Sequence, residues 1–230
     1  MLESLIKDLE KLKNPEKAKI LQRFFKTGKG EYGEGDQFLG IAVPLQRKVA
    51  KKYRDLNLVD LQTLLNSNIH EQRLISLLIL IDKYKKADEN EKRIIVNFYL
   101  KNTKNINNWD LVDLSCRDII GQHFFDKDRS LLYKLAKSKN IWERRIAIIS
   151  TWWFIHEKQF ADTLKIAEIL LKDKHDLIHK AVGWMLREVG KKDQTSLEKF
   201  LDKYHKMMPR TMLRYAIEKF DNNKKTYYLK

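Results

Sequence analysis

Apolar residues recur along this chain at the spacing of an α-helix, in segments that repeat. HEQRLISLLIL begins at His70, WERRIAIISTW at Trp142, HDLIHKAVGWML at His175 and MPRTMLRYAI at Met208. The last three start about 33 residues apart and the first two about twice 36, with WDLVDLSCRDII from Trp109 between them. Paired helices with such a period are typical of HEAT-type repeats, which bury their apolar faces against their neighbours. The sequence therefore predicts an all-α fold, an α-solenoid of HEAT-like repeats.

The rest of the chain also favours helices. Three prolines and eight glycines in 230 residues are too few for turn-rich β structure. Short polar breaks separate the helical segments, at 66–68, 102–108, 137–140 and 172–175. An irregular helical bundle is the alternative, because the repeats match in pattern more than in identity. We expect a single domain over residues 1–230, since each repeat depends on its neighbours for burial.

A glycine-rich segment, KTGKGEYGEGDQFLGIAVPLQR (26–47), interrupts the helical pattern. Three of its glycines match GxGxxG, a phosphate-binding fingerprint: Gly28, Gly30 and Gly33. No predicted strand precedes them, and the neighbouring acidic residues would repel a phosphate. We interpret the glycines as positions of positive φ between two helices, with Pro44 opening the second helix.

The charge balance indicates a polyanionic partner. Lys plus Arg number 46 and Asp plus Glu 31, which gives a formal net charge of +15. Such an excess favours nucleic acid as the partner. A solvated basic surface without a partner would have the same totals, so the distribution of the charges has to decide between the two.

Cysteine usage and hydropathy exclude several classes of protein. Cys116 is the single cysteine, which excludes an internal disulfide, and six histidines without a second thiol argue against a structural zinc site. No stretch approaches about 18 uncharged apolar residues, and the N-terminus lacks the apolar core of a signal peptide. We expect a cytoplasmic protein with no membrane partner.

A tryptophan and an aspartate stand four residues apart in NINNWDLVDLSCRDIIGQ (105–122). On a helix that begins near Asn108 and is capped by Asn107 or Asn108, Trp109 and Asp113 are neighbours on one face. The helix dipole favours the ionised form of Asp113. An ionised carboxylate beside an aromatic face is suited to stabilising a cation. In the alternative, Trp109 is a core anchor and Asp113 only complements the dipole.

Further cations surround a second tryptophan. HKAVGWMLREVGKK places four residues at i, i+4, i+7 and i+11 of one helix: Lys180, Trp184, Arg187 and Lys191. Such a stripe suits a phosphate backbone with a sugar or base face, although Trp184 packed in the core among solvated lysines is the alternative. Arg144 and Arg145 open the preceding repeat on a helix that is apolar nearly all round, so we expect both guanidiniums to reach outward.

In this order and at these separations, five segments resemble the DNA alkylation repair family of AlkD-type glycosylases. They are GEYGEGDQFLGIAVPLQRKVAKKY, HEQRLISLLIL, INNWDLVDLS, IWERRIAII and HKAVGWMLREVG. The resemblance runs over nearly the whole chain. It implies a HEAT-like solenoid whose concave face holds duplex DNA. It also implies a monofunctional glycosylase that releases positively charged N3- and N7-alkylated purines without flipping the damaged nucleotide.

The resemblance implies roles for single residues as well. It makes Asp113 the catalytic carboxylate, lines the deoxyribose of the lesion with Trp109 and Trp184, and assigns a nearby phosphate contact to Arg145. Arg144 stands beside Arg145 and is the open alternative for that contact. From the stripe, we add Lys180, Arg187 and Lys191 as DNA-binding residues.

One position departs from the family pattern. Some members carry a tyrosine near the end of the second helix, where this chain reads QRFFKTG. We expect Phe25 to stack on DNA there, in place of a phenol contact.

The chemistry of the lesion sets what else the site requires. An alkylated purine already carries a positive charge and leaves without a general acid, so we expect neither a metal nor a cofactor. The expected substrate is double-stranded DNA containing alkylated purines, and a monomer is enough to hold one duplex. The alternatives are a non-catalytic HEAT-like protein that recognises distorted or branched DNA, and a scaffold for an acidic protein.

Overall fold

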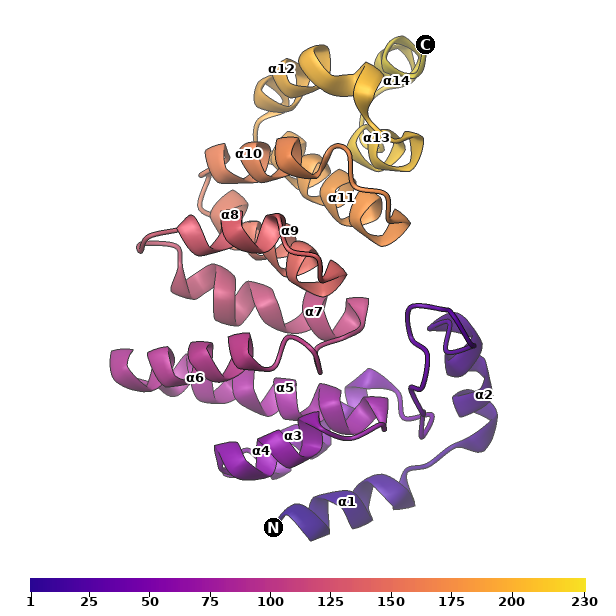
Figure 1. Cartoon of the computed structure of the whole chain (residues 1–230), viewed down its shortest axis with the longest axis vertical. Helices are drawn as coiled ribbons and strands as arrows, with labels where there is room; N and C mark the ends of the chain where they lie inside the picture. Colours follow the sequence, from indigo (N-terminus) through magenta and orange to yellow (C-terminus); the bar gives the residue numbers. More distant parts are fainter. The chain divides into compact units, whose positions relative to one another are not determined.

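The computed structural model describes residues 1–230 and is helical, with no β-strand (Figure 1). The α-helices follow in the order α1 (Leu2–Lys11), α2 (Pro15–Phe24), α3 (Val43–Lys52), α4 (Leu58–Leu65), α5 (His70–Lys86), α6 (Glu89–Lys101), α7 (Trp109–Cys116), α8 (Ser130–Ala136), α9 (Ile141–His156), α10 (Ala161–Leu170), α11 (Asp176–Lys192), α12 (Gln194–Tyr204), α13 (Arg210–Ala216) and α14 (Asn222–Leu229). A π-helix (Arg117–Gly121) continues α7, and a 3-10 helix (His205–Met207) follows α12. The predicted all-α fold is confirmed.

Local sequence sets where the helices begin. The Asn140 side chain accepts a hydrogen bond from the Trp142 amide at 2.9 Å, in one of the predicted polar breaks. Asp88 and Glu91 form a capping box, in which each side chain accepts a hydrogen bond from the other's backbone amide. Pro44 stands in the first turn of α3, as predicted, where no amide donor is needed.

The chain forms two compact units, Met1–Ser115 and Cys116–Lys230. In the first unit, α5 is the central helix, and α3, α4 and α6 pack against it. All of its residues from His70 to Ile81 are buried. Because these neighbours cover α5 on several sides, its buried residues lie nearly all round the helix rather than along one stripe.

In the second unit, each long helix packs against the next long helix. α9 contacts α8, α10 and α11, and α11 contacts α10, α12 and α13. This is the neighbour-to-neighbour packing expected of helical repeats, within the unit. No helix in the chain is long and apolar enough to cross a membrane.

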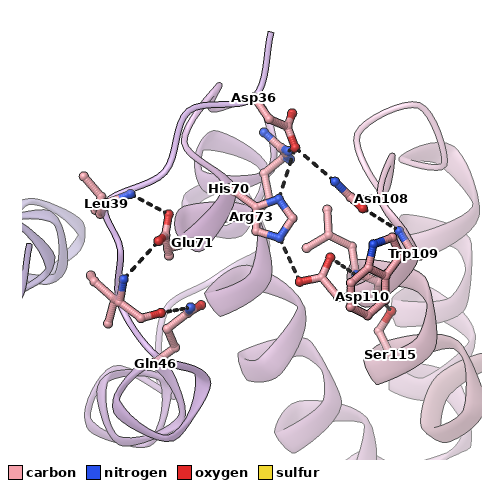
Figure 2. Close-up of polar contacts among 12 residues, drawn as sticks. Asp36, Leu39, Gln46, His70, Glu71, Arg73, Asn108, Trp109, Asp110 and Ser115 are labelled. Carbon is pink, nitrogen blue, oxygen red and sulfur yellow. Dashed lines mark hydrogen bonds and ion pairs between the residues drawn. The ribbon is translucent and has the colours of Figure 1, made fainter. Parts of the chain in front are cut away.

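A buried carboxylate holds the glycine-rich segment of the first unit in place. Glu71 is fully buried, and its oxygens accept hydrogen bonds from the amides of Leu39 at 2.9 Å, Gly40 at 2.8 Å and Ile41 at 3.1 Å (Figure 2). Of the three glycines in the GxGxxG match, Gly30 adopts positive φ, as expected, and Gly28 and Gly33 do not; Gly35 and Gly40 are the other two positions of positive φ in the segment. The anchored chain carries Asp36 and Phe38 into the interior.

Gly40 offers a test of this anchoring. Its φ is +82°, and a Cβ at this position would fall on the Asn14 carbonyl oxygen. We expect Gly40→Ala to lower the free energy of unfolding by at least about 2 kcal/mol, from left-handed strain plus the clash with backbone. Gly30→Ala is the matched control, because Gly30 has a φ of +79° with open space around it. It should lose only roughly 1 kcal/mol in denaturant titration, and equal losses would contradict the clash.

Candidate active site

The N-terminal half of α7 carries the predicted catalytic residues of the first unit. The Asn108 side-chain oxygen accepts a hydrogen bond from the Trp109 amide at 2.8 Å, so the helix begins where the sequence predicts. Asp110 Oδ1 accepts one from the Leu111 amide, also at 2.8 Å. Trp109 and Asp113 are both half-buried. Their i, i+4 spacing places them on one face of α7.

A buried cluster of four charged groups lies beside this turn. We define the charge cluster as Asp36, His70, Arg73 and Asp110. His70 Nδ1 lies 3.1 Å from Asp36 Oδ2, and His70 Nε2 lies 2.8 Å from Asp110 Oδ2 (Figure 2). An Arg73 guanidinium nitrogen lies 2.7 Å from the same Asp36 oxygen. Two carboxylates thus meet two cations, which balances the charge in a dry environment.

The cluster changes the ionisation of its members. Burial opposes the charged form of His70, but the charge of Asp110 and the hydrogen bonds from His70 to both carboxylates outweigh it and raise the pKa of His70 to about 9. Burial also opposes ionisation of Asp36, while the hydrogen bond from His70 and the charge of Arg73 lower the pKa of Asp36. His70 is therefore an imidazolium at neutral pH.

Sequence reasoning missed this cluster. Its members are far apart in the chain, because His70 is 34 residues from Asp36 and 40 from Asp110. The available signal was indirect: polar residues open two helices, α5 and α7, whose other residues are largely apolar. A buried polar side chain at such a position needs a partner, but only the fold shows which one it has.

An aromatic stack connects the cluster to the candidate tryptophan. The Phe25 ring stacks on Trp109, with centroids 5.0 Å apart and planes at 11°, and on Phe38 at 5.0 Å. Phe38 in turn stacks on His70 at 4.5 Å. Phe25 is 7% exposed and Phe24 is 61% exposed. Phe25 is therefore too buried to stack on DNA as predicted. The exposed ring is that of Phe24, because neighbouring residues at the end of α2 point to different sides of the helix.

Two arginines open α9 in the second unit. Arg144 Nε donates to Asp173 Oδ2 at 2.6 Å, and Arg145, which is 5% exposed, donates to the Leu177 carbonyl at 2.5 Å. The expectation that both guanidiniums reach outward is wrong. Arg144 turns to the segment before α11 and to the carbonyls of Ser138 and Lys139, and Arg145 turns to the first turn of α11. A guanidinium taken out of water has to place its N–H groups on acceptors.

The predicted stripe is present on one face of α11. It consists of Lys180, Trp184, Arg187 and Lys191. Glu188 lies among these residues, and its Oε1 accepts a hydrogen bond from Trp184 Nε1 at 3.1 Å and one from Lys191 Nζ at 2.7 Å. Glu188 is not distinguished by the helical spacing of the stripe, yet its hydrogen bond sets the orientation of the half-buried indole of Trp184.

Carboxylates meet the other cations of the stripe as well. Lys180 Nζ lies 2.7 Å from Asp176 Oδ2, and Arg187 pairs with Glu218. The stripe is therefore less positive than the cations alone imply. Ion pairs at exposed positions contribute little to stability, so a phosphate can compete for these cations.

The arrangement within each unit defines what it offers chemically. The first unit places a half-buried indole and a carboxylate on one turn of α7, beside a stack that ends in an imidazolium. The second unit places a half-buried indole among paired cations. No group of three or more His, Cys, Asp or Glu side chains is arranged to hold a metal ion.

Comparisons with known proteins identify a family by its sequence model and a shared fold by solved structures. A family model described as DNA alkylation repair enzyme matches residues 5–220. A solved structure described as a predicted DNA alkylation repair enzyme from Enterococcus faecalis is 17% identical with a TM-score of 0.71, covering 91% of this chain and 97% of that one. No curated protein matches the sequence.

Two further solved structures come from Streptococcus mutans. One is smu.31 of strain UA159, 15% identical with a TM-score of 0.58, over 78% of this chain and 93% of that one. The other is AlkD2, 14% identical with a TM-score of 0.58, over 89% and 97% of the two chains. At these identities the three structures show a shared fold.

The two phenylalanines at the end of α2 give a matched pair of substitutions. We expect Phe25→Ala to lower the free energy of unfolding by about 3 to 5 kcal/mol, because it leaves a cavity against Trp109 and Phe38. Phe24→Ala should lower it by less than about 1 kcal/mol, since that ring is mostly in water. Denaturant titration of both variants measures the difference. Similar losses in the two would contradict the burial of Phe25.

His70 predicts a pH dependence of stability. Its pKa is 6.5 unfolded and about 9 folded, so its stabilisation is complete below pH 6.5 and is lost as the pH rises through about 9. The shift corresponds to about 3 kcal/mol. Unfolding titrations between pH 6 and pH 10 should show this slope in the wild type and not in His70→Gln. His156→Gln, at an exposed histidine, is the control and should keep it. An unchanged slope in His70→Gln would exclude His70 as its source.

Proposed function

The chain belongs to the DNA alkylation repair enzyme family, and from this premise we propose that it hydrolyses the N-glycosidic bond of positively charged N3- and N7-alkylated purines in duplex DNA. The reaction releases the damaged base and leaves an abasic sugar. The base stays in the helix stack during the reaction, so the enzyme works on the sugar. One copy of the chain acts on one duplex.

The proposed mechanism follows from the charge of the lesion. An alkylated purine is a cation and leaves as a neutral base, so the leaving group needs no proton. As the bond breaks, positive charge moves to the deoxyribose, which becomes an oxocarbenium-like cation. A carboxylate about 4 Å away stabilises this charge by roughly 4 kcal/mol at an effective dielectric constant near 20. That amount corresponds to a rate increase of about a thousandfold.

Asp113 is the proposed carboxylate. It faces the developing cation and also orients the attacking water. The C1′–N bond breaks with its electron pair going to the purine, the water oxygen bonds to C1′, and the proton that the water loses passes to solvent. The indole face of Trp109 adds about 0.5 to 2 kcal/mol by cation-π attraction to the sugar, and the family resemblance implies the same role for Trp184. These interactions grow with the charge of the sugar, so they stabilise the transition state more than the ground state.

One observation carries this proposal. Trp109 and Asp113 occupy one face of α7, and both side chains are half-buried rather than sealed in the core. The first turn of α7, which bears Trp109, accepts hydrogen bonds at the Asn108 and Asp110 side chains. A carboxylate and an aromatic face on one side of a helix are suited to a substrate that becomes a cation.

The second unit supplies the proposed DNA contacts. Lys180, Arg187 and Lys191 bind phosphates, for which they exchange their present carboxylate partners. Arg145 contacts a phosphate near the lesion, as the family resemblance implies. Arg144 is the alternative donor because it is less buried.

Substitution of Asp113 tests the proposal. We expect Asp113→Asn to reduce release of 7-methylguanine from a duplex oligonucleotide by about a thousandfold, because the neutral amide does not stabilise the sugar cation. Binding to the same duplex at fixed salt should change by less than about threefold, since the phosphate contacts remain. Single-turnover release and a binding titration on the same samples measure the two effects.

Asp55→Asn is the matched control. Asp55 lies in the same unit with 78% of its side chain exposed, so its variant should release the base at the wild-type rate. Wild-type protein that binds the duplex tightly without releasing any base would overturn the proposal. It would favour a non-catalytic protein that binds distorted or branched DNA.

A further inference from the structure

His70 occupies a position where only its charged form satisfies every contact. Both ring nitrogens face carboxylate oxygens, at 3.1 Å and 2.8 Å. A carboxylate accepts hydrogen bonds and a neutral imidazole donates only one, so both contacts require the imidazolium. The ring is 2% exposed, and the backbone amide of His70 donates to the Gln37 carbonyl at 2.8 Å. The imidazolium is therefore fixed in place and direction.

Two routes connect this ring to Trp109. The first runs through the backbone of α7, because Asp110 directly follows Trp109 and receives the His70 Nε2 hydrogen bond (Figure 2). Asn108, on the other side of Trp109, donates to Asp36 at 3.5 Å and accepts from the Trp109 amide. The second route runs through stacked rings. His70 stacks on Phe38, Phe38 stacks on Phe25, and Phe25 stacks on the Trp109 indole.

We propose that His70 is a positioning residue that sets the orientation of the Trp109 indole and of the first turn of α7. It touches neither the substrate nor Asp113 in this role and acts through Asp110 and the aromatic stack. The orientation of Trp109 follows from the contacts alone, and its effect on base release rests on the proposed function.

The positioning depends on the charge of His70. The groups that face the ring are Asp36 from the glycine-rich segment, Asp110 from α7 and Arg73 from its own helix, while α2 contributes the Phe25 ring. Loss of the ring proton leaves one carboxylate without its donor, at a site where water does not replace it. The first turn of α7 is then no longer held on both sides of Trp109.

A ¹⁹F NMR titration of protein labelled with 5-fluorotryptophan tests this directly. The Trp109 signal is assigned by its loss in Trp109→Phe. In the wild type we expect that signal to move with a midpoint near pH 9, the titration of His70. In His70→Gln it should start at a different position and not move in this range. His156→Gln is the control, because His156 stacks on Trp152 at 5.6 Å and its loss should move the Trp152 signal and not that of Trp109.

Base release gives the second measurement. His70→Gln should lower kcat by about 10- to 100-fold with KM nearly unchanged, as expected for a misplaced group rather than a lost binding contact. A Trp109 signal that is insensitive to pH near 9 in the wild type overturns the inference, whether or not the variant folds. A Trp109 signal that follows His70 in a protein that releases no base would instead retain the positioning and overturn the proposed function.

Discussion

The imidazolium of His70 joins three segments that are distant in the sequence. It donates to Asp36 in the glycine-rich segment and to Asp110 in α7, while its own backbone begins α5. Charges removed from water require a partner on each polar atom, so these contacts leave little freedom in how the three segments approach one another. The candidate site depends on this constraint, because Trp109 stands between Asn108 and Asp110. Glu71, which follows His70 in the chain, also holds the glycine-rich segment, because its carboxylate accepts hydrogen bonds from three backbone amides of that segment.

Charge and position play different parts in the two units. In the first unit, opposite charges are buried together, and their ion pairs hold His70 where its ring packs against the aromatic stack. In the second unit, the three cations of the α11 stripe are paired with carboxylates that a phosphate can replace. The net charge of +15 is thus a long-range attraction for a polyanion, and it says little about which side chains would touch one.

Particular residues show how far sequence reasoning reached. The start of α7, the stripe on α11 and the helix opened by Pro44 follow from local signals such as caps, helical spacing and backbone preferences. Phe25 and Phe24 are chemically identical neighbours, so no pattern distinguishes the buried ring from the exposed one. Arg145 was expected outside because its helix is apolar nearly all round, yet it is 5% exposed and donates a hydrogen bond to the Leu177 carbonyl.

The sequence by itself determined the helical class, four of the breaks between helices and the family, together with Trp109 and Asp113 as neighbours on one face. Those properties depend on residues within a few turns of one another, or on motifs in a given order. Only the tertiary structure decided that His70 lies between Asp36 and Asp110, that Phe25 stacks on Trp109, and that Glu188 orients Trp184. Contacts of this kind depend on which elements pack together and on the rotamer each side chain adopts there, and neither is encoded in local spacing.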